Sequence, residues 1–182
     1  MNGEIFAAVA GHMEKAWERG VVFCDQVCRH QVPRKADIVI TCPGGFPRDF
    51  DLRQSQKAIS LAELVVHENG VIILVAKCSD GIGKQDLYEL LRDAGSPRQM
   101  IEKFRRLGFT ASSRKAYMFA RAMLKARLIV VTDGIDPGQL EEMMLTSAPT
   151  VEDALEISFQ ELGRNAKILG IPQADLLIPV PD

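Results

Sequence analysis

Short runs of valine, isoleucine and leucine recur along the chain between longer stretches whose apolar residues repeat with helical spacing. The runs predict β-strands over residues 5–9, 21–27, 37–42, 71–76, 128–132 and 166–171, with a short extension over 176–179. Apolar runs that alternate with helical stretches are typical of parallel sheets covered by helices. The sequence therefore predicts an α/β fold with a three-layer, mostly parallel, Rossmann-like sheet flanked by helices.

Capping residues and helix breakers divide the remaining stretches into predicted helices over 52–67, 84–94, 97–107, 113–126, 137–145 and 151–162. The first of these follows Asp51, and we expect it to end at Asn69-Gly70, because glycine readily adopts the left-handed conformation that closes a helix. Ser96 and Thr150 precede two further helices, where a hydroxyl can accept a hydrogen bond from a free backbone N–H group.

Size and charge narrow the class of protein. The chain has 182 residues, 47% of them hydrophobic, and no linker or repeat, so we expect residues 1–182 to form a single domain. The 22 basic and 24 acidic residues are scattered along the chain, which argues against a nucleic-acid partner. No apolar run approaches the roughly 20 residues that span a bilayer, and the first residues do not resemble a signal peptide. We expect a cytoplasmic protein that contacts no membrane.

Four cysteines fall in or beside predicted strands: Cys24, Cys28, Cys42 and Cys78. Small buried thiols are common in reduced intracellular proteins, so we expect these side chains to pack in the core without disulfides. The alternative is a metal site formed by Cys24, Cys28 and His30. Three intervening residues and the lack of a second ligand pair favour core packing, so we predict no metal site.

Three loops rich in glycine and charge follow predicted strands, over residues 43–51, 77–83 and 133–138. In open α/β sheets, ligands bind beyond the carboxyl ends of the strands, where helix N-termini present free N–H groups. The first loop contains Gly44-Gly45, which permits close approach of the backbone, and it precedes a helix that carries Gln54 and Lys57. Their spacing puts both on one face of the first two turns, where the helix dipole favours an anion. An amide donor and an ammonium group there suit a small carboxylate.

Each of these residues also has a structural interpretation. Gln54 is the third residue after Asp51, a capping-box position, and is as consistent with a cap as with a ligand. Lys57 taken alone is typical of a solvated surface lysine. Four glycines can simply be turn residues: Gly44, Gly45, Gly81 and Gly83. Neither pair forms the G-x-G-x-x-G motif, so a nucleotide-dependent enzyme rests on fold analogy alone.

Several segments also carry a family resemblance. They read A-D-I-V-I-T-C-P-G-G-F-P-R-D over 36–49, D-L-R-Q-S-Q-K-A over 51–58 and N-G-V-I-I-L-V-A-K-C-S-D-G-I-G over 69–83, followed by A-P-T-V-E-D-A-L over 148–155 and A-K-I-L-G-I-P over 166–172. Together they resemble the C-terminal domain of nickel-dependent lactate racemases over nearly the whole chain. The most specific part runs from G-G-x-P-x-D to Q-x-x-K.

The resemblance implies a reaction. Enzymes of this family use a nickel pincer nucleotide to take a hydride from a 2-hydroxy acid and return it to either face, while two histidines exchange the hydroxyl proton. Groups of the C-terminal domain hold the carboxylate and polarise the oxygens. At the matching positions, Lys57 would form an ion pair with the substrate and Gln54 would donate a hydrogen bond to it.

We assign supporting roles to the remaining residues of these loops. Gly44 and Gly45 would lie in the substrate-binding loop. Asp49 would anchor this loop and Asp51 would cap the helix. Gly81 and Gly83 would shape the second loop.

The sequence departs from the family because the N-terminal domain is missing. Family enzymes carry their catalytic histidines, the nickel-binding histidine and the cofactor-bearing lysine there, whereas this chain has only His12, His30 and His67, in no matching motif. We therefore expect no cofactor in this chain and a nickel pincer nucleotide in the complete enzyme. The expected partners are a small 2-hydroxy acid and an N-terminal catalytic domain, in the same or a separate chain.

Two other assemblies stay open from the sequence. The chain can self-associate as a homo-oligomer through the apolar surface that a partner domain would cover. Alternatively, it is a stand-alone module that binds a small carboxylate or assembles with a partner, without catalysis.

Overall fold

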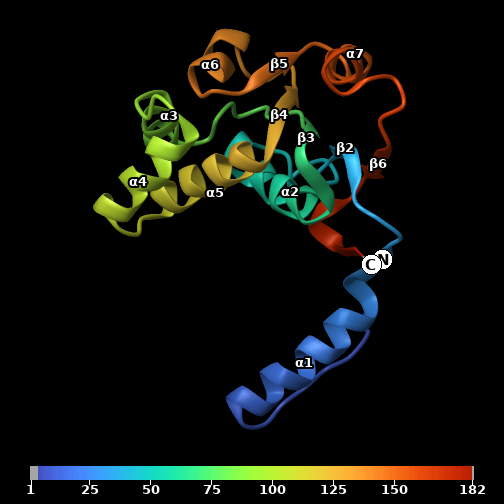
Figure 1. Cartoon of the computed structure of the whole chain (residues 1–182). Helices are drawn as coiled ribbons and strands as arrows, with labels where there is room; N and C mark the ends of the chain where they lie inside the picture. The colour runs from blue at the N-terminus through green and yellow to red at the C-terminus, as the bar shows by residue number, and fades with distance from the viewer. Residues whose placement is uncertain (1–3, 182) are drawn as a thin grey trace.

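Five parallel strands form the centre of the protein (Figure 1). The computed structural model describes residues 4–181. The strands lie in the order β5 (Thr146–Ala148), β4 (Ala126–Val131), β3 (Val66–Val75), β2 (Ala36–Thr41) and β6 (Ile168–Ile171). Every adjacent pair is parallel. The predicted α/β class with a mostly parallel sheet is confirmed.

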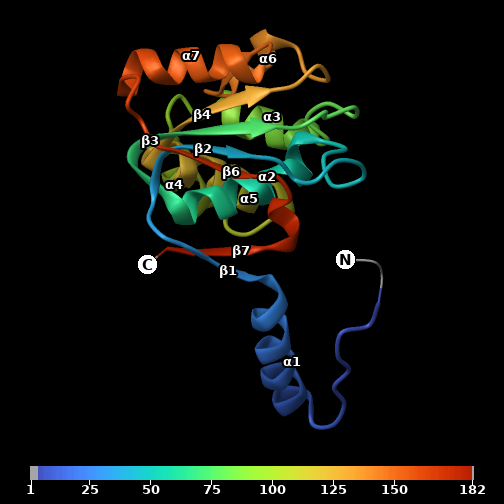
Figure 2. The same cartoon turned by 90° about the vertical axis from the view of Figure 1, so that its right-hand side faces the viewer.

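Helices cover both faces of this sheet (Figure 2). One face carries α2 (Leu52–Val65) and α5 (Ala111–Lys125), with α3 (Gln85–Arg92) and α4 (Pro97–Leu107) packed against α5. The other face carries α7 (Val151–Leu162), and α6 (Pro137–Glu142) lies beside β5. Within residues 4–181, no helix combines the length and the apolar character needed to cross a bilayer.

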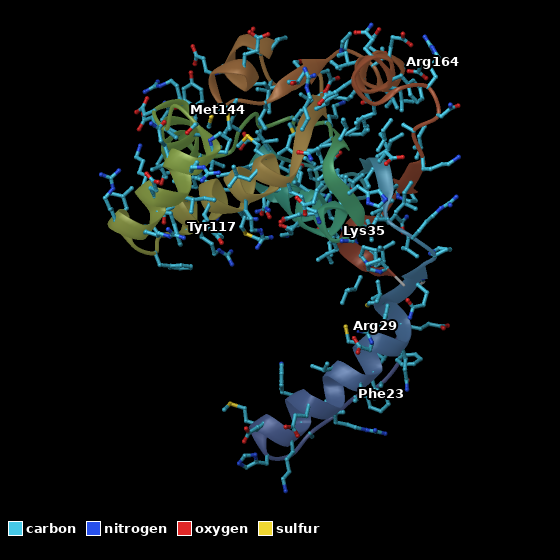
Figure 3. The ribbon with its side chains drawn as sticks, in the orientation of Figure 1. Phe23, Arg29, Lys35, Tyr117, Met144 and Arg164 are labelled. Atoms are coloured by element: carbon cyan, nitrogen blue, oxygen red, sulfur yellow. The ribbon has the colours of Figure 1, made fainter. Side chains whose placement is uncertain are left out.

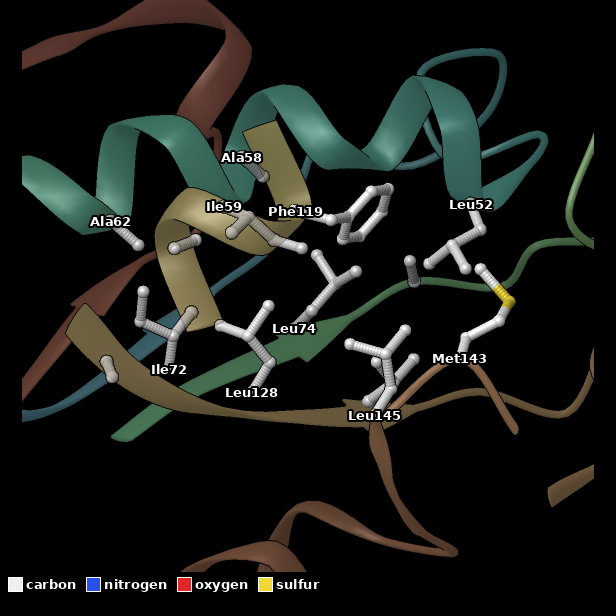
Figure 4. Packing of buried hydrophobic residues seen from close by; sticks show 14 of the residues in the cluster. Leu52, Ala58, Ile59, Ala62, Ile72, Leu74, Phe119, Leu128, Met143 and Leu145 are labelled. Atoms are coloured by element: carbon white, nitrogen blue, oxygen red, sulfur yellow. The ribbon is translucent and has the colours of Figure 1, made fainter. Parts of the chain in front are cut away.

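The core follows the alternation of side chains along the strands. Ile72 and Leu74 of β3 are buried under α2 and α5 beside Phe119 (Figure 4). Val71 and Ile73, the intervening residues, are buried in a second cluster on the opposite face of the sheet. Successive residues of a strand point to opposite faces, so a continuous apolar run is the pattern of a strand covered on both sides.

Most predicted elements of this central part are confirmed. The strands over 37–42, 71–76, 128–132 and 166–171 are present within a few residues, and the helices over 97–107 and 151–162 have the predicted bounds. The structure adds β1 (Arg29–Val32) and β5, which are too short and too polar to stand out in the sequence. The predicted extension over 176–179 is a short 3₁₀ helix, η1 (Ala174–Leu176), followed by β7 (Ile178–Pro181), which pairs with β1 in a separate two-stranded sheet.

The predictions for the first thirty residues are wrong. Residues 21–27 lie inside α1 (Met13–Cys28), and residues 5–9 have no strand. The helix and the segment before it form an arm, residues 4–28, that projects away from the sheet (Figures 1 and 3). The V-V-F run has strand propensity, but it has no neighbouring strand to pair with, and Met13, Trp17 and Val21 follow each other at helical spacing.

The cysteines also differ from the expectation. All four are free, but only Cys78 is buried. Cys24 and Cys28 lie on the arm with their Sγ atoms 3.7 Å apart, where Cys24 is exposed. The core-packing prediction is therefore wrong for Cys24 and Cys28, because both lie in α1, which has no buried residue.

Helix α2 ends at Val65, before the predicted Asn69-Gly70 stop. Asn69 has a positive φ of 60°, but it lies within β3. The register between β2 and β3 shifts there, between the Ala36–Val66 pair and the Ile38–Val71 pair. Gly70 lies at this irregularity, and a Cβ on it would be 2.6 Å from the carbonyl oxygen of Asp37. The dipeptide therefore accommodates a shift between strands instead of closing a helix.

We predict that Gly70→Ala lowers the free energy of unfolding by about 1–3 kcal/mol, because the added methyl group collides with the backbone of β2. The matched control is Gly170→Ala in β6, where a Cβ would meet no atom within 4 Å. That control should change stability by less than about 0.5 kcal/mol. Urea unfolding of both variants measures the difference, and equal stabilities would contradict the proposed steric role of Gly70.

Candidate functional site

The three predicted loops lie at the carboxyl edge of the sheet, after β2, β3 and β4. The first two are joined by backbone hydrogen bonds. Cys78 N–H donates to the Asp49 carbonyl at 2.9 Å, Asp80 N–H donates to the Phe50 carbonyl at 2.9 Å, and Leu52 N–H donates to the Gly81 carbonyl at 3.0 Å. The third loop joins them through Thr132, whose hydroxyl donates to the Lys77 carbonyl at 2.8 Å.

Two buried carboxylates lie in the first loop. Asp49 Oδ2 accepts a hydrogen bond from Lys77 N–H at 3.2 Å, so its side chain also connects the first loop to the second. Asp51 is the N-cap of α2, and its Oδ1 accepts from Gln54 N–H at 2.5 Å. Asp49 and Asp51 are 9% and 7% exposed, so backbone N–H groups replace the water that each charged group would otherwise require.

The glycines of these loops lie in turns. Gly44 and Gly45 have positive φ angles of 106° and 78°, and the Gly45 carbonyl accepts from Arg48 N–H at 2.8 Å. Gly81 has a φ of 64°. Gly83 has a φ of 87°, and a Cβ there would lie 2.4 Å from Asp51 Oδ2, so only glycine fits beside the capping carboxylate.

Gln54 takes part in the cap through its backbone. Its N–H group is the one that Asp51 accepts, whereas its side-chain amide forms no hydrogen bond with any residue in 4–181. The residue is partly exposed. The Gln54 amide is therefore available to a ligand.

Lys57 lies one turn further along α2. Its side chain is 53% exposed, and its Nζ atom is 3.9 Å from Asp175 Oδ2 in η1. Lys57 is thus on the exposed side of α2, whereas Gln54 lies at the boundary between this side and the buried side, one turn before the buried Ala58. Asp175 did not stand out in the sequence, because its proximity to Lys57 arises only from the packing of the C-terminal segment against α2.

Positive charge accumulates around Lys57. Arg53 precedes it on α2, and Arg114 and Lys115 belong to the neighbouring helix α5. Burial, followed by repulsion from Arg114, Lys57 and Arg53, lowers the pKa of the Lys115 ammonium group to about 8. Four basic side chains thus lie near the starts of α2 and α5, together with the carboxylate of Asp175.

Cys78 also lies among these loops, with a positive φ of 50°. Burial raises the pKa of its thiol to about 11, and the charges of Asp49 and Asp51 contribute in the same direction. The thiol is therefore protonated near neutral pH, which makes it a poor nucleophile.

The histidines do not join this site. His12 and His30 lie at the two ends of α1, and His67 is in the first part of β3, at the edge of the sheet opposite the loops. Within residues 4–181, no three His, Cys, Asp or Glu side chains are grouped closely enough to hold a metal ion.

Comparison with known sequences identifies relatives of this chain. Residues 31–178 match the family model of the lactate racemase C-terminal domain. The chain is 31% identical to the lactate racemase of Thermoanaerobacterium thermosaccharolyticum over 172 residues, and 32% identical to that of Lactiplantibacillus plantarum over 173 residues. Each alignment covers 93% of this chain and 40% of the relative. The chain thus spans about 40% of the length of these racemases.

Comparison with solved structures also identifies similar proteins. The lactate racemase apoprotein of T. thermosaccharolyticum matches with a TM-score of 0.87 at 30% identity, over 93% of this chain and 41% of that one. A protein from Thermotoga maritima matches with a TM-score of 0.62 at 13% identity, over 93% of this chain and 42% of that one, which shows a shared fold.

We predict that Asp51→Ala lowers the free energy of unfolding by about 1 kcal/mol, because the first turn of α2 loses its cap. Asp51→Asn should retain most of this stability, because asparagine also caps well. Gln54→Ala should change stability by less than about 0.5 kcal/mol, because its side chain has no partner in the cap. Urea unfolding measures all three, and a loss at Gln54 equal to that at Asp51 would restore the capping interpretation of the glutamine side chain.

Proposed function

This chain belongs to the lactate racemase C-terminal domain family, and from that premise we propose that it is the substrate-side half of a 2-hydroxyacid racemase or epimerase. The observation that carries the proposal is the position of the Q-x-x-K motif. Gln54, which is partly exposed, and Lys57, which is exposed, lie three residues apart in the first two turns of α2, at the sheet edge where α/β proteins bind ligands. In the proposal, Lys57 forms an ion pair with the substrate carboxylate, and the Gln54 amide donates a hydrogen bond to the substrate.

The surrounding residues support this assignment. Asp51 orders the helix start that carries both side chains, and Asp49 holds the preceding loop in place. The turn at Gly44 and Gly45 is open beside Gly45, where a Cβ would meet no atom within 4 Å. A carboxylate held at two points is oriented as well as bound, which is the contribution that positioning makes to catalysis.

The proposal divides the reaction between two halves. Inversion at C2 requires a hydride acceptor and acid–base groups, and the described histidines of this chain lie away from the site. In the family a nickel pincer nucleotide supplies the hydride chemistry. Because the described histidines lie outside the carboxyl-edge loops and α2, the proposal assigns that cofactor and the catalytic histidines to an N-terminal half, in the same or a separate polypeptide.

The arm supports the presence of such a half. No residue of α1 is buried, and Met13 and Trp17 are 85% and 69% exposed. The alignments to the racemases are longer than the family match, and few residues follow residue 178, so the shared stretch includes part of the arm. We propose that the apolar side of the arm contacts the N-terminal half, because exposed apolar surface of this kind is typical of interfaces.

The direct test is reconstitution. We expect the chain, mixed with an N-terminal half of a lactate racemase that carries its nickel cofactor, to interconvert L- and D-lactate, while neither part does so alone. Lys57→Ala should lower kcat/KM by about 100-fold or more, because an ion pair with the substrate is lost. Chiral chromatography of the lactate pool measures the reaction.

The matched control is Lys167→Ala, which removes an exposed lysine beside β6 at the opposite edge of the sheet and should leave the rate unchanged. Full activity of the Lys57→Ala variant would refute the role of this lysine. Lactate binding by the chain without turnover in any reconstituted mixture would favour the stand-alone binding module.

A further inference from the structure

Basic residues of helix α5 contact α2 at both ends of the interface between the two helices. At the end far from the loops, Lys125 donates to the Glu63 carbonyl, and Arg121 forms an ion pair with the Glu63 carboxylate at 2.8 Å. At the end near the loops, Lys115 donates to Gln56 Oε1 at 2.8 Å. The far end thus has a carboxylate partner for its cations, whereas Lys115 has a neutral amide.

The near end carries a surplus of positive charge. Lys115 is only 6% exposed, and the charged groups that act on it are Arg53 and Lys57 of α2, Arg114 of α5 and Asp175 of η1. Asp175 is the one carboxylate in this set. Arg53 Nε and Asp175 Oδ1 are both buried without a hydrogen-bond partner in the described structure. Buried cations and unsatisfied donors are costly, and an added anion would compensate the charge of Lys115 and could accept from Arg53 Nε, although not from the Asp175 oxygen, which is itself an acceptor.

The ionisation of Lys115 is sensitive to such an anion. Burial is the largest cause that lowers its pKa to about 8, and the charges of Arg114, Lys57 and Arg53 add to it. A negative charge next to Lys57 would oppose these cations and raise the pKa of Lys115 again. Anion binding and protonation of Lys115 therefore favour each other, because such coupling is reciprocal.

We propose that Lys115 gives the carboxylate site a second, buried positive charge and takes up a proton from solvent when a carboxylate binds at Lys57. This inference rests on the proposed function, which places the substrate carboxylate at Lys57. Lys115 is a positioning residue in this scheme, because it is linked to α2 through Gln56 and acts on the ligand through its charge. The affinity for a carboxylate should then fall as the pH rises from 7 to 9.

The test is a titration of the chain with sodium L-lactate at constant ionic strength, followed by backbone amide NMR at pH 7 and pH 9. We expect the wild-type dissociation constant to rise by about threefold to tenfold between the two pH values. The Lys115→Met variant should bind lactate at pH 7 about as weakly as the wild type does at pH 9. Its dissociation constant should change little between pH 7 and pH 9. Lys57→Ala should lose binding at both.

Lys125→Met is the matched control, because it removes the other lysine of α5 that donates to α2 and lies far from the loops. It should keep the wild-type pH dependence. Replacement of a poorly paired buried charge by an apolar chain of similar length usually preserves a fold. If Lys115→Met does not fold, Lys115→Gln gives the same comparison.

Three results would overturn the proposal: no lactate binding by the chain, the same wild-type affinity at both pH values, or an unchanged pH dependence in the Lys115 variants. Calorimetry of lactate binding at pH 8, in two buffers of different ionisation enthalpy, measures the number of protons taken up per lactate bound. Equal binding heats in the two buffers would mean that no proton is taken up and would also overturn the proposal. Absence of turnover after reconstitution would refute the proposed function while leaving this pH-dependent binding intact, so the two proposals fail separately.

Discussion

The two buried aspartates of the first loop fix the start of α2, and the rest of the candidate site depends on this attachment. Asp49 accepts a hydrogen bond from the second loop, and Asp51 accepts one from the first turn of the helix. Charged groups that are buried this deeply persist only when they are hydrogen-bonded, so both loops and the helix must adopt one arrangement. Gln54 and Lys57 are consequently presented at the carboxyl edge of the sheet in a fixed relation.

The charged residues along α2 and its neighbour α5 are paired differently at the two ends of α2. Its apolar side packs on the sheet, and its far end is neutralised where Glu63 meets Arg121. Near the loops, Asp175 Oδ2 lies 3.9 Å from Lys57 Nζ, and Lys115 is hydrogen-bonded to the neutral amide of Gln56. A substrate carboxylate would add a negative charge beside these two lysines. The proposal assigns the redox chemistry to another half, because the described histidines lie outside the carboxyl-edge loops and α2.

The sequence predicts the elements whose signals are local. The strand over 37–42 and the helix that starts after Asp51 follow from an apolar run and a capping residue, and Ser96 and Thr150 cap their helices as expected. The arm was mispredicted because β-branched propensity says nothing about whether a partner strand exists. Asn69 adopts the left-handed conformation typical of a helix end, but here it serves a register shift. The contact of Lys115 with Gln56 joins residues 59 positions apart and leaves no local signal.

The central claim is that the accessible face of α2 holds the carboxylate of a 2-hydroxy acid. The most direct measurement is a crystal structure of this chain, assembled with an N-terminal half, in complex with an unreactive 2-hydroxy acid analogue. Our account predicts that the carboxylate lies within ion-pair distance of Lys57 Nζ and within hydrogen-bond distance of the Gln54 amide. A ligand bound elsewhere, with Lys57 still facing Asp175 and Gln54 free, would contradict it.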